Sequence, residues 1–549
     1  MGGSRVVAWT GLFSVGLALV AGGGCRGGES GGGGASSAGT GGGGGATGPC
    51  SIAHQGTSGV AIQGTLLTST AVMAGEVLID ASGKIACAAS SCASAPGYAD
   101  ATVVACPDAV VSPGLINAHD HTDFATAGPI DHGTTRWEHR NGWRKGTDGE
   151  QKLAEPGFSD DPTINATGEL RFVLGGATSI VGSGGTKGLL RNLAAYPDES
   201  LLEAGAVGPT AFFDTFPLGD QDGTEITSGC AYPNPRSASS AFGSGAAYVP
   251  HVAEGINLAA ENEFTCVAGS LGLLTDKTAI IHGVGMNAHD VQAMAAAHAK
   301  LIWSPRTNVS LYGNTAPVTE FKALGVTIAL GTDWLASGSM NMLRELQCAD
   351  FMNKTYFGTA FTDQELWLMA TKNAAIAAGF DAQIGDLAPG LLGDVAVFTG
   401  ATKDYRAVID AGVEDVRLVL RGGKVLYGDK AIVEALDPTC HDFDACGVAK
   451  QVCIDAPGVA LGSIEASANG IYPLFFCKGT TPTNEPSCVP YRGEYPSGPK
   501  AGDADGDGVP DANDVCPMTF DPVRPMDGAA QADVDGDGQG DACDASPAG

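Results

Sequence analysis

Two histidines stand one residue apart at the end of an apolar run, in the segment VVSPGLINAHDHTDF (residues 110–124). On a β-strand, residues i and i+2 point to the same face, so His119 and His121 could share one ligand. A pair of buried imidazoles is costly unless each finds a partner, and a divalent cation would satisfy both. The spacing therefore predicts a metal site, and other parts of the chain must supply its remaining ligands.

Three further apolar runs end in residues that can bind a metal or carry a proton. AAYVPHVAEG contains His251 with Glu254 three residues later, AIIHG ends at His282, and IALGTD ends at Asp333. With the histidine pair, they form a set of nitrogen and oxygen ligands that leaves room for a water, as in catalytic zinc sites. A cation lowers the pKa of its bound water toward about 7, and a carboxylate that touches both, here Asp333, can accept the proton.

The segments that carry these residues alternate between strand and helix patterns. From residue 113 to 380, apolar strands alternate with alanine-rich helical segments, which indicates a parallel sheet. At this length the leading form is an α/β fold, a (β/α)8 TIM barrel, although the pattern does not reveal its fourth strand. Glycine-broken strand patterns at 51–112 and 381–435 predict a composite β-sandwich built from both flanks of the barrel.

The motifs PGLINAHDH, HVAE, IHG and LGTDW, in this order between residues 113 and 400, resemble those of the amidohydrolase superfamily. These are metal-dependent hydrolases on a (β/α)8 barrel, and the deaminase- and chlorohydrolase-like branch is the most similar. The resemblance implies one divalent transition metal, zinc first and iron as the alternative, bound by His119, His121, His251 and Asp333. It also implies that His282 polarises the substrate, that Glu254 passes a proton to the leaving nitrogen, and that Asp333 is the third catalytic residue.

The number of metals follows from a missing residue. Dinuclear members of this family bridge their metals with a carboxylated lysine on the fourth strand, yet no lysine stands between Lys187 and Lys277. A single metal is therefore predicted, with Asp214 in AFFDTFP as the nearby acid that could substitute for the lysine.

Three other features allow more than one interpretation. Glu254 could instead cap a helix that begins near Gly255, where a carboxylate suits the helix dipole. Trp303 stands where nucleobase and triazine deaminases of the family usually have a histidine, which argues against a purine or pyrimidine substrate. The loop DHGTTRWEHRNGW carries Arg136, Trp137, Arg140 and Trp143, and it could close over a flat or acidic substrate or only pack on the rim.

The remaining histidines are interpreted as surface or helix residues: His54, His132, His139, His289, His298 and His441.

The N-terminal residues predict export. The apolar run 6–20 follows Arg5 and is shorter than the roughly 20 residues of a membrane-spanning helix, so residues 1–25 read as a signal peptide. LVAGGGC resembles the cleavage box of bacterial lipoproteins, in which Cys25 would carry lipid, although Gly22 departs from the usual leucine. Residues 26–50 read as a Gly/Ser linker. The protein is expected in the cell envelope, held to a membrane by lipid, or outside the cell after ordinary signal cleavage.

The cysteines and the charge support this location and limit the partners. The chain has fifteen cysteines, and without Cys25 fourteen remain, an even number that predicts disulfides in an oxidising compartment. Five of them (Cys440, Cys446, Cys453, Cys477 and Cys488) crowd into a disulfide-rich extension, residues 436–500. A formal net charge of −31 argues against nucleic acid as a partner.

The acidic tail, residues 501–549, contains a repeated unit. DADGDGVPDAND and DVDGDGQGDACD begin thirty residues apart, with acids at positions 1, 3, 5, 9 and 12 and glycine at position 6. This is the spacing of a calcium loop, and the tail resembles thrombospondin type 3 repeats; a disordered acidic tail is the alternative. The predicted calcium ligands are Asp503, Asp505, Asp507, Asp511, Asp514, Asp533, Asp535, Asp537, Asp541 and Asp544.

Two functions from different classes follow. The first is a metal-dependent hydrolase that cleaves C–N bonds other than peptide bonds in a small-molecule substrate, of amide, amidine or deaminase type, through a metal-activated water. The alternative is a non-catalytic, calcium-dependent surface or adhesion protein with a vestigial barrel. The intact set of metal ligands favours the enzyme.

Overall fold

The computed structural model describes residues 50–194, 199–243 and 245–549. The predicted signal peptide and all but the last residue of the predicted linker lie outside the described residues. Within the described ranges, no helix combines the length and the apolar character that crossing a membrane requires.

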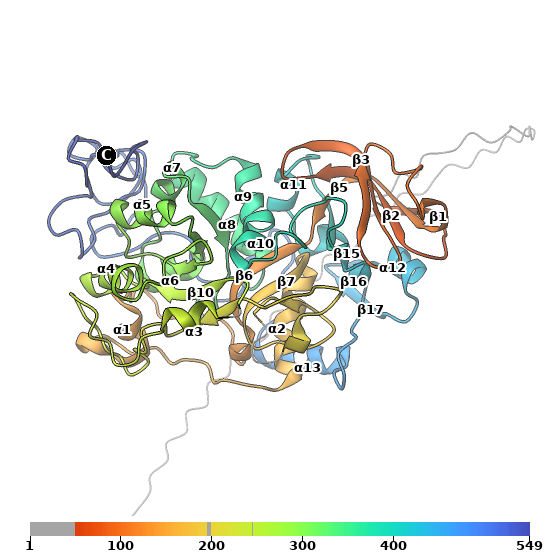
Figure 1. The fold of residues 1–549 in the computed structure, drawn as a ribbon, viewed down its shortest axis with the longest axis horizontal. Helices are drawn as coiled ribbons and strands as arrows, with labels where there is room; N and C mark the ends of the chain where they lie inside the picture. The colour runs from red at the N-terminus through yellow and green to blue at the C-terminus, as the bar shows by residue number, and fades with distance from the viewer. Residues whose placement is uncertain (1–49, 195–198, 244) are drawn as a thin grey trace, which may run out of the picture. The chain divides into compact units, whose positions relative to one another are not determined.

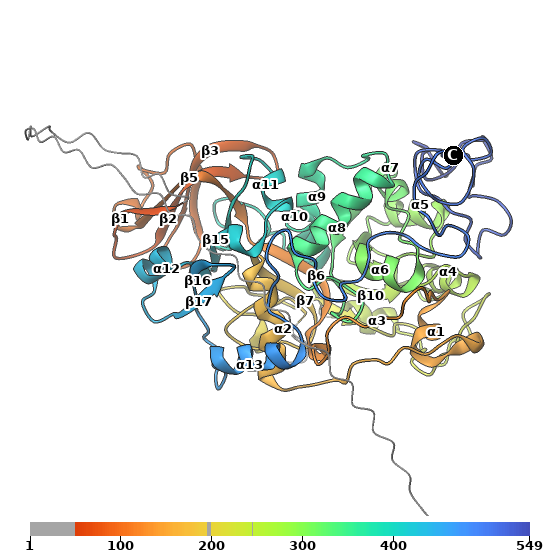
Figure 2. The ribbon, with the colours of Figure 1, turned by 180° about the vertical axis from the view of Figure 1, so that it is seen from behind.

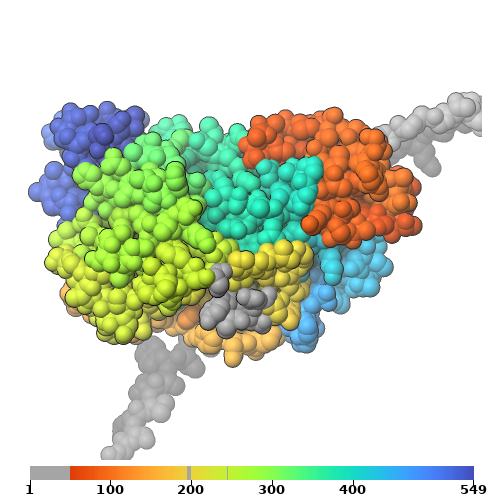
Figure 3. Space-filling model, viewed as in Figure 1, coloured from red at the N-terminus to blue at the C-terminus, as the bar shows by residue number. Residues whose placement is uncertain are grey.

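Strands from both flanks of the chain form one sheet of ten strands (Figure 1). The N-terminal flank supplies β1 (Ser51–His54), β2 (Val60–Leu67), β3 (Val72–Ile79), β4 (Ile85–Ala89) and β5 (Thr102–Pro113). The C-terminal flank supplies β14 (Val395–Thr399), β15 (Val416–Arg421), β16 (Lys424–Asp429), β17 (His441–Ala445) and β18 (Val448–Val452). Antiparallel pairing of β14 with the long β5 joins the flanks. On the molecular surface, residues of the N-terminal flank lie beside residues from the later part of the chain, orange beside cyan (Figure 3).

This sheet differs in two respects from the two facing sheets expected at 51–112 and 381–435. Hydrogen bonds connect all ten strands, in the order β17-β18-β16-β15-β14-β5-β2-β3-β4 with β1 on β5. The sheet also continues beyond residue 435, because β18 in the predicted disulfide-rich extension pairs with β16. Part of the extension therefore forms an edge of this sheet. The extension is too short to build a hydrophobic core alone, and it packs instead on the core of the sheet.

Between the flanks, the described residues contain eight strands in two parallel sheets. One sheet has the order β6-β7-β8: β6 (Leu115–His121), β7 (Ala177–Ser183), β8 (Arg191–Asn192). The other has the order β13-β12-β11-β10-β9: β9 (Phe212–Asp214), β10 (Tyr248–Val252), β11 (Ala279–His282), β12 (Lys300–Trp303), β13 (Thr327–Leu330). Strand β9 occupies the place of the fourth strand that the pattern did not reveal, and its three residues are too few to show an alternation.

Single backbone hydrogen bonds link the two parallel sheets at both junctions. Ala211 N donates to Leu193 O at 2.8 Å beside β8 and β9, and Asp333 N donates to His119 O at 3.0 Å beside β13 and β6. These bonds place the end of the last strand next to the end of the first. The closed eight-stranded barrel itself stays a prediction, because no continuous ladder joins the two sheets in the described residues.

Helices lie around the parallel strands and also against the ten-stranded sheet (Figures 1 and 2). Their bounds are α1 (Arg140–Lys145), α2 (Pro162–Leu174), α3 (Ala238–Phe242), α4 (Leu258–Thr265), α5 (Ala288–Ala296), α6 (Pro305–Tyr312), α7 (Val318–Ala323), α8 (Met342–Thr355), α9 (Asp363–Met369), α10 (Lys372–Ala378), α11 (Arg406–Ile409), α12 (Lys430–Leu436) and α13 (Leu461–Ile471). Adjacent strand residues such as Ile280 and Ile281 enter different apolar clusters, so the strands are buried on both faces.

Seven disulfides pair the fourteen cysteines that follow Cys25. They are Cys50–Cys106, Cys87–Cys92, Cys230–Cys266, Cys348–Cys488, Cys440–Cys453, Cys446–Cys477 and Cys516–Cys543. Two of them close within the extension, and Cys348–Cys488 ties its end to α8. Cys516–Cys543 connects the two acidic repeats of the tail.

Candidate metal and catalytic site

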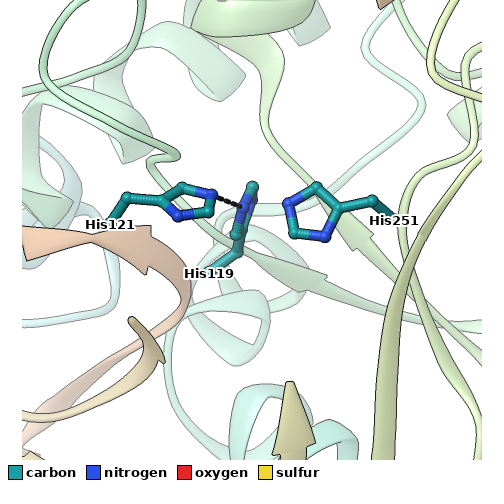
Figure 4. A group of neighbouring side chains, drawn as sticks. All are labelled: His119, His121 and His251. Carbon is teal, nitrogen blue, oxygen red and sulfur yellow. Dashed lines mark hydrogen bonds between the residues drawn. The ribbon is translucent and has the colours of Figure 1, made fainter. Parts of the chain in front are cut away.

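The histidine pair lies at the carboxyl end of β6, where both imidazoles point to the same side (Figure 4). Their Nε2 atoms are 3.3 Å apart, and His119 is fully buried. Asp333, which follows β13, places its Oδ1 atom 3.5 Å from Nε2 of His119 and 3.7 Å from Nε2 of His121. Alternation along the strand brings the pair together, and the junction of β13 with β6 brings the carboxylate to it.

His251 joins this group from β10. Ligand atoms of His119, His121 and His251 lie within 4.8 Å of one another, and so do those of His119, His282 and Asp333. Nδ1 of His251 is 3.1 Å from the carbonyl oxygen of Asp214, whereas the buried Nε2 atom has no hydrogen-bond partner. An unsatisfied nitrogen that faces other imidazoles is costly unless a cation binds there.

The protonation states suit a metal. Burial, together with the neighbouring histidines, lowers the pKa of His119 and His251 well below the ordinary value. Burial and the charge of His282 lower the pKa of His121 to about 3. Neutral imidazoles are the form that binds metal ions, so this donor set fits a divalent transition metal such as zinc. Burial and the charge of Glu254 raise the pKa of Asp333 well above its usual range.

A second layer of hydrogen bonds fixes the proposed ligands. His121 Nδ1 is 2.9 Å from Ser183 Oγ, which donates to Asp123 at 2.6 Å. Trp334 N and Thr307 Oγ1 donate to the two oxygens of Asp333 at 2.7 and 3.1 Å. Bonds of this kind orient ligands and set the tautomer of histidines.

Two site residues have unusual backbone conformations. His282 has φ of 74° and Asp333 has φ of 56°, in the left-handed region that residues with a side chain seldom adopt. Both stand where a strand ends, and the turn redirects their side chains toward the histidine pair. Such strain is typical of functional sites.

Glu254 lies beside the same group and caps no helix. Its Oε2 atom is 3.6 Å from Nε2 of His282 and 3.9 Å from Nη1 of Arg140. Helix α4 begins at Leu258 and has Asn257 as its N-cap, so the capping interpretation of Glu254 does not hold. The buried carboxylate accepts a 2.6 Å hydrogen bond from the hydroxyl of Tyr312, a residue that sequence reasoning did not single out.

His139 was expected at the surface or on a helix and is instead buried behind Glu254. Its ring nitrogens are 3.4 Å from Glu225 and 3.1 Å from Glu263. Burial alone would lower the pKa of His139, but the two carboxylates raise it to about 9. Arg140 is fully buried next to it and forms a 2.6 Å ion pair with Asp220. These ion pairs could not be predicted from residue spacing, because the acids lie far along the chain from the histidine and the arginine.

Several features that the sequence singled out are placed elsewhere. The carboxylate of Asp214 binds Arg236 at 2.7 Å and Tyr248 at 3.1 Å, so it is held by other groups and not by the histidines. Trp303 is buried in an apolar cluster and donates to Thr315 at 2.7 Å. Arg136 donates to backbone carbonyls of its own loop. The loop therefore packs its aromatic residues inward.

Of the ten predicted calcium ligands in the tail, six fall into two compact groups, and Asp521 joins the first of them. Carboxylates of Asp505, Asp507, Asp514 and Asp521 lie within 4.8 Å of one another, and so do those of Asp533, Asp535 and Asp537. Asp521 was not among the predicted ligands, because it lies beyond the first twelve-residue unit. The other predicted ligands, Asp503, Asp511, Asp541 and Asp544, lie outside these two groups.

The first acidic group carries more negative charge than its hydrogen bonds satisfy. Burial and the neighbouring Asp507 and Asp514 raise the pKa of Asp505 to about 7, and burial with the same neighbours raises the pKa of Asp521 to about 10. Buried oxygens of Asp505, Asp514 and Asp521 have no hydrogen-bond partner. A hard cation with oxygen ligands would relieve both the repulsion and the unsatisfied atoms.

Parts of the chain are similar to known proteins. Residues 238–426 match the Amidohydrolase family. Over 128 residues the chain is 38% identical to a 5-methylthioadenosine/S-adenosylhomocysteine deaminase of Teredinibacter turnerae, which covers 23% of this chain and 29% of that relative. Over 177 residues it is 30% identical to an 8-oxoguanine deaminase of Pseudomonas aeruginosa, covering 31% and 39% of the two chains. The chain thus spans well under half the length of these relatives.

A solved structure shows a similar fold. The structure of an adenosine deaminase from Xanthomonas campestris with bound zinc aligns over 75% of this chain and 97% of its own, with a TM-score of 0.50 and 18% sequence identity. This alignment shows that the two chains have a similar fold.

We predict that His251→Ala removes the transition metal. Wild-type protein loaded with zinc and dialysed should retain about one zinc per chain, because the buried imidazole supplies an otherwise unpartnered ligand atom. Elemental analysis checks this, with the exposed His289→Ala as the control that should keep the metal. Full zinc retention in His251→Ala, or two tightly held metals in the wild type, would contradict the assignment.

We also predict that the charge of His139 stabilises the fold at neutral pH. Its pKa rises from about 6.5 in the unfolded chain to about 9 in the folded one, so this stabilisation is fully present below pH 6.5 and is lost as the pH rises through 9. Because 1 pKa unit corresponds to about 1.4 kcal/mol, His139→Gln should cost about 3 kcal/mol at pH 6 and much less at pH 10. Denaturation followed by tryptophan fluorescence measures both, and His289→Gln should show no such dependence.

Proposed function

We propose that this protein is a metal-dependent hydrolase of C–N bonds other than peptide bonds, of the deaminase or amidase type. The observation that carries the proposal is the meeting of His119, His121, His251 and Asp333 in one buried group, with Glu254 and His282 beside it. These residues come from four strands or the turns that follow them, and apart from the pair on β6 and the neighbours His251 and Glu254 they are distant in the sequence. Their convergence supports a site that is maintained for catalysis.

We place this site at the mouth of a closed (β/α)8 barrel. The eight parallel strands and the hydrogen bonds at both junctions between their sheets support closure. In such a barrel the residues that follow the strands meet at one face, where catalytic groups gather. The positions of His251, His282 and Asp333 at strand ends agree with that face.

One metal ion, zinc or iron, would be held by His119, His121, His251 and Asp333. When bound it would activate a water for attack on the substrate carbon. The chain's own residues divide the remaining work. Asp333 would accept a proton from the water, and Glu254, whose Oε2 atom is 3.6 Å from Nε2 of His282, would pass this proton on to the leaving nitrogen, so that both carboxylates end ionised. His282 would polarise the substrate at the reacting carbon.

A calcium-dependent adhesion protein with a vestigial barrel is the competing function. A decayed site would lose its costly buried groups, because unpaired polar atoms in a core destabilise the fold. Here four imidazoles and two carboxylates are retained and oriented by Ser183, Thr307 and Tyr312. This second layer favours catalysis over adhesion.

The substrate is a small molecule with a C–N bond that the site can reach. The relatives named above are deaminases of purine compounds, whereas Trp303, which stands where such deaminases usually have a histidine, argues against purines. The proposal therefore names a reaction class and no single substrate.

We further propose that the protein is exported and anchored through lipid on Cys25, which agrees with the seven disulfides of the described residues.

We propose that the tail binds calcium, with Asp521 added to the ligands of the first group. Gln531 donates to Asp507, Asp514 and Asp521 at 2.8 to 2.9 Å and so joins the start of the second repeat to the first. The tail also reaches the barrel, because Arg524 donates to the carbonyls of Val284 and Met286 after β11. Both ribbon views show it beside α5 and α7 (Figures 1 and 2).

The catalytic proposal predicts C–N bond cleavage that depends on two carboxylates, measured as ammonia release from a deaminase-type substrate and as ring opening of a cyclic amide. Zinc-loaded protein should be screened with methylthioadenosine, adenosine, 8-oxoguanine, cyclic amides and amidines. For the compound that is turned over, Asp333→Asn should abolish activity and Glu254→Gln should lower kcat about 100-fold or more, because general acid–base groups contribute factors of about 10² to 10⁴.

The control for this screen is Glu434→Gln, an exposed residue of α12 that should leave activity unchanged. If zinc-loaded protein with one metal per chain turns over no compound of these classes, the adhesion function is favoured. Unchanged turnover in Glu254→Gln would instead leave the enzyme in place and remove the role of this carboxylate.

The calcium proposal predicts order in two places at once. Calcium should slow hydrogen exchange in residues 501–549, since it neutralises the repulsion among the acids, and also at residues 284–286, where Arg524 is bound. Asp521→Asn should weaken calcium binding, whereas the exposed Asp160→Asn should not. Hydrogen exchange and calorimetry with calcium chloride provide the measurement, and an equal response in both variants would contradict the ligand assignment.

A further inference from the structure

Tyr312, the last residue of α6, makes a specific contact with Glu254. Its hydroxyl donates to Oε1 of Glu254 at 2.6 Å, and both side chains are buried. The contact joins two segments that are 58 residues apart in the chain. A charge-assisted bond of this length is among the stronger hydrogen bonds in proteins.

The direction of this hydrogen bond is set by a second contact. Nε1 of Trp143 donates to the hydroxyl oxygen of Tyr312 at 2.9 Å, and an indole nitrogen can only donate. The tyrosine therefore accepts from Trp143 and has its single proton left for Glu254. Burial and the charge of Glu254 raise the pKa of Tyr312 well above its usual range, so the hydroxyl remains a donor at working pH.

The bond fixes which oxygen of Glu254 faces the site. With Oε1 held by Tyr312, Oε2 is the atom that lies 3.6 Å from Nε2 of His282. Arg140 stands 3.9 Å from the same oxygen and is itself held by Asp220 and by the carbonyl of Thr215. The carboxylate therefore has one oxygen in a fixed hydrogen bond and one oxygen available for proton transfer.

We propose that Tyr312, oriented by Trp143, is a positioning residue that holds Glu254 with Oε2 toward His282 for proton delivery. The proposal rests on the proposed function for the role of Glu254 in catalysis, whereas the orientation itself can be tested without a substrate. A wrongly rotated carboxylate would still be present and charged, but misplaced by a distance that is costly for proton transfer.

The first experiment compares crystal structures of zinc-loaded wild type and Tyr312→Phe. The variant keeps the ring that packs in the core and loses only the hydroxyl, so we expect an intact fold with the Glu254 carboxylate rotated away from His282. Tyr427→Phe is the matched control, because it removes a buried hydroxyl that donates to the carbonyl of Val413. An unchanged Glu254 in Tyr312→Phe would overturn the proposal whether or not the protein is an enzyme.

The second experiment measures kcat and KM on the compound found by the screen. Tyr312→Phe should lower kcat by about 10- to 100-fold, as loss of an orienting partner typically does, with KM and zinc content unchanged. Trp143→Phe should lower kcat less, and should add nothing in the Tyr312→Phe background, because both act on Glu254 through one chain of hydrogen bonds.

The outcomes of the two experiments are separable. Equal kcat in wild type and Tyr312→Phe, or fully additive effects of the two substitutions, would overturn the positioning role. A wild type without turnover would contradict the proposed function, and the crystal structures would still decide the orientation of Glu254. A loss of zinc together with kcat in Tyr312→Phe would also overturn the proposal, since it would show a structural effect on the metal ligands.

Discussion

The burial of ionisable groups around one small volume is the constraint on which the rest of this structure depends. His119, His251 and Asp333 have almost no contact with solvent, and Arg140 and Glu263 behind them are equally buried. Charges in such surroundings are tolerated only when each is paired, neutralised or bound to a metal. The lowered pKa values of the two histidines favour their neutral form, the arginine is paired with Asp220, and the remaining nitrogen of His251 has no hydrogen-bond partner among the described residues.

This constraint explains which site residues were predictable from the sequence. His119 and His121 were evident because a period of two is a property of the strand itself. His251, His282 and Asp333 were evident because each ends an apolar run, and the amidohydrolase resemblance gave them an order. Their roles as ligands and catalytic groups remain predictions, since geometry shows only that they meet.

The residues that the sequence could not reveal are those whose partners are distant. Tyr312 and His139 act through Glu254, Glu225 and Glu263, and these pairs form only when α6, α1 and α4 pack at the ends of the strands. Nothing in the local pattern distinguishes such a histidine from one on a solvated loop. The short β8 and β9 were hidden for a different reason, because two or three residues are too few to carry a periodic signal. The edge strand β17 and its neighbour β18 were assigned to a separate extension, because the cysteines around them suggested a module that stands alone.

The tail, which the sequence suggests is a separate module, is bound to the rest of the structure by hydrogen bonds. It holds a single arginine, Arg524, which pairs with Asp527 and also donates to two carbonyls of the segment that follows His282. Just before the tail, Arg492 donates to the carbonyl of Tyr312 at 2.9 Å and to that of Trp137 at 3.2 Å. Backbone carbonyls in loops need such donors when they are buried. The carbonyls of Tyr312 and of the segment that follows His282 thus accept hydrogen bonds from guanidinium groups 180 and 240 residues further along the chain. Because the hydroxyl of Tyr312 is bound to Glu254 and its carbonyl to Arg492, hydrogen bonds join the C-terminal segments to a candidate site that contains none of their side chains.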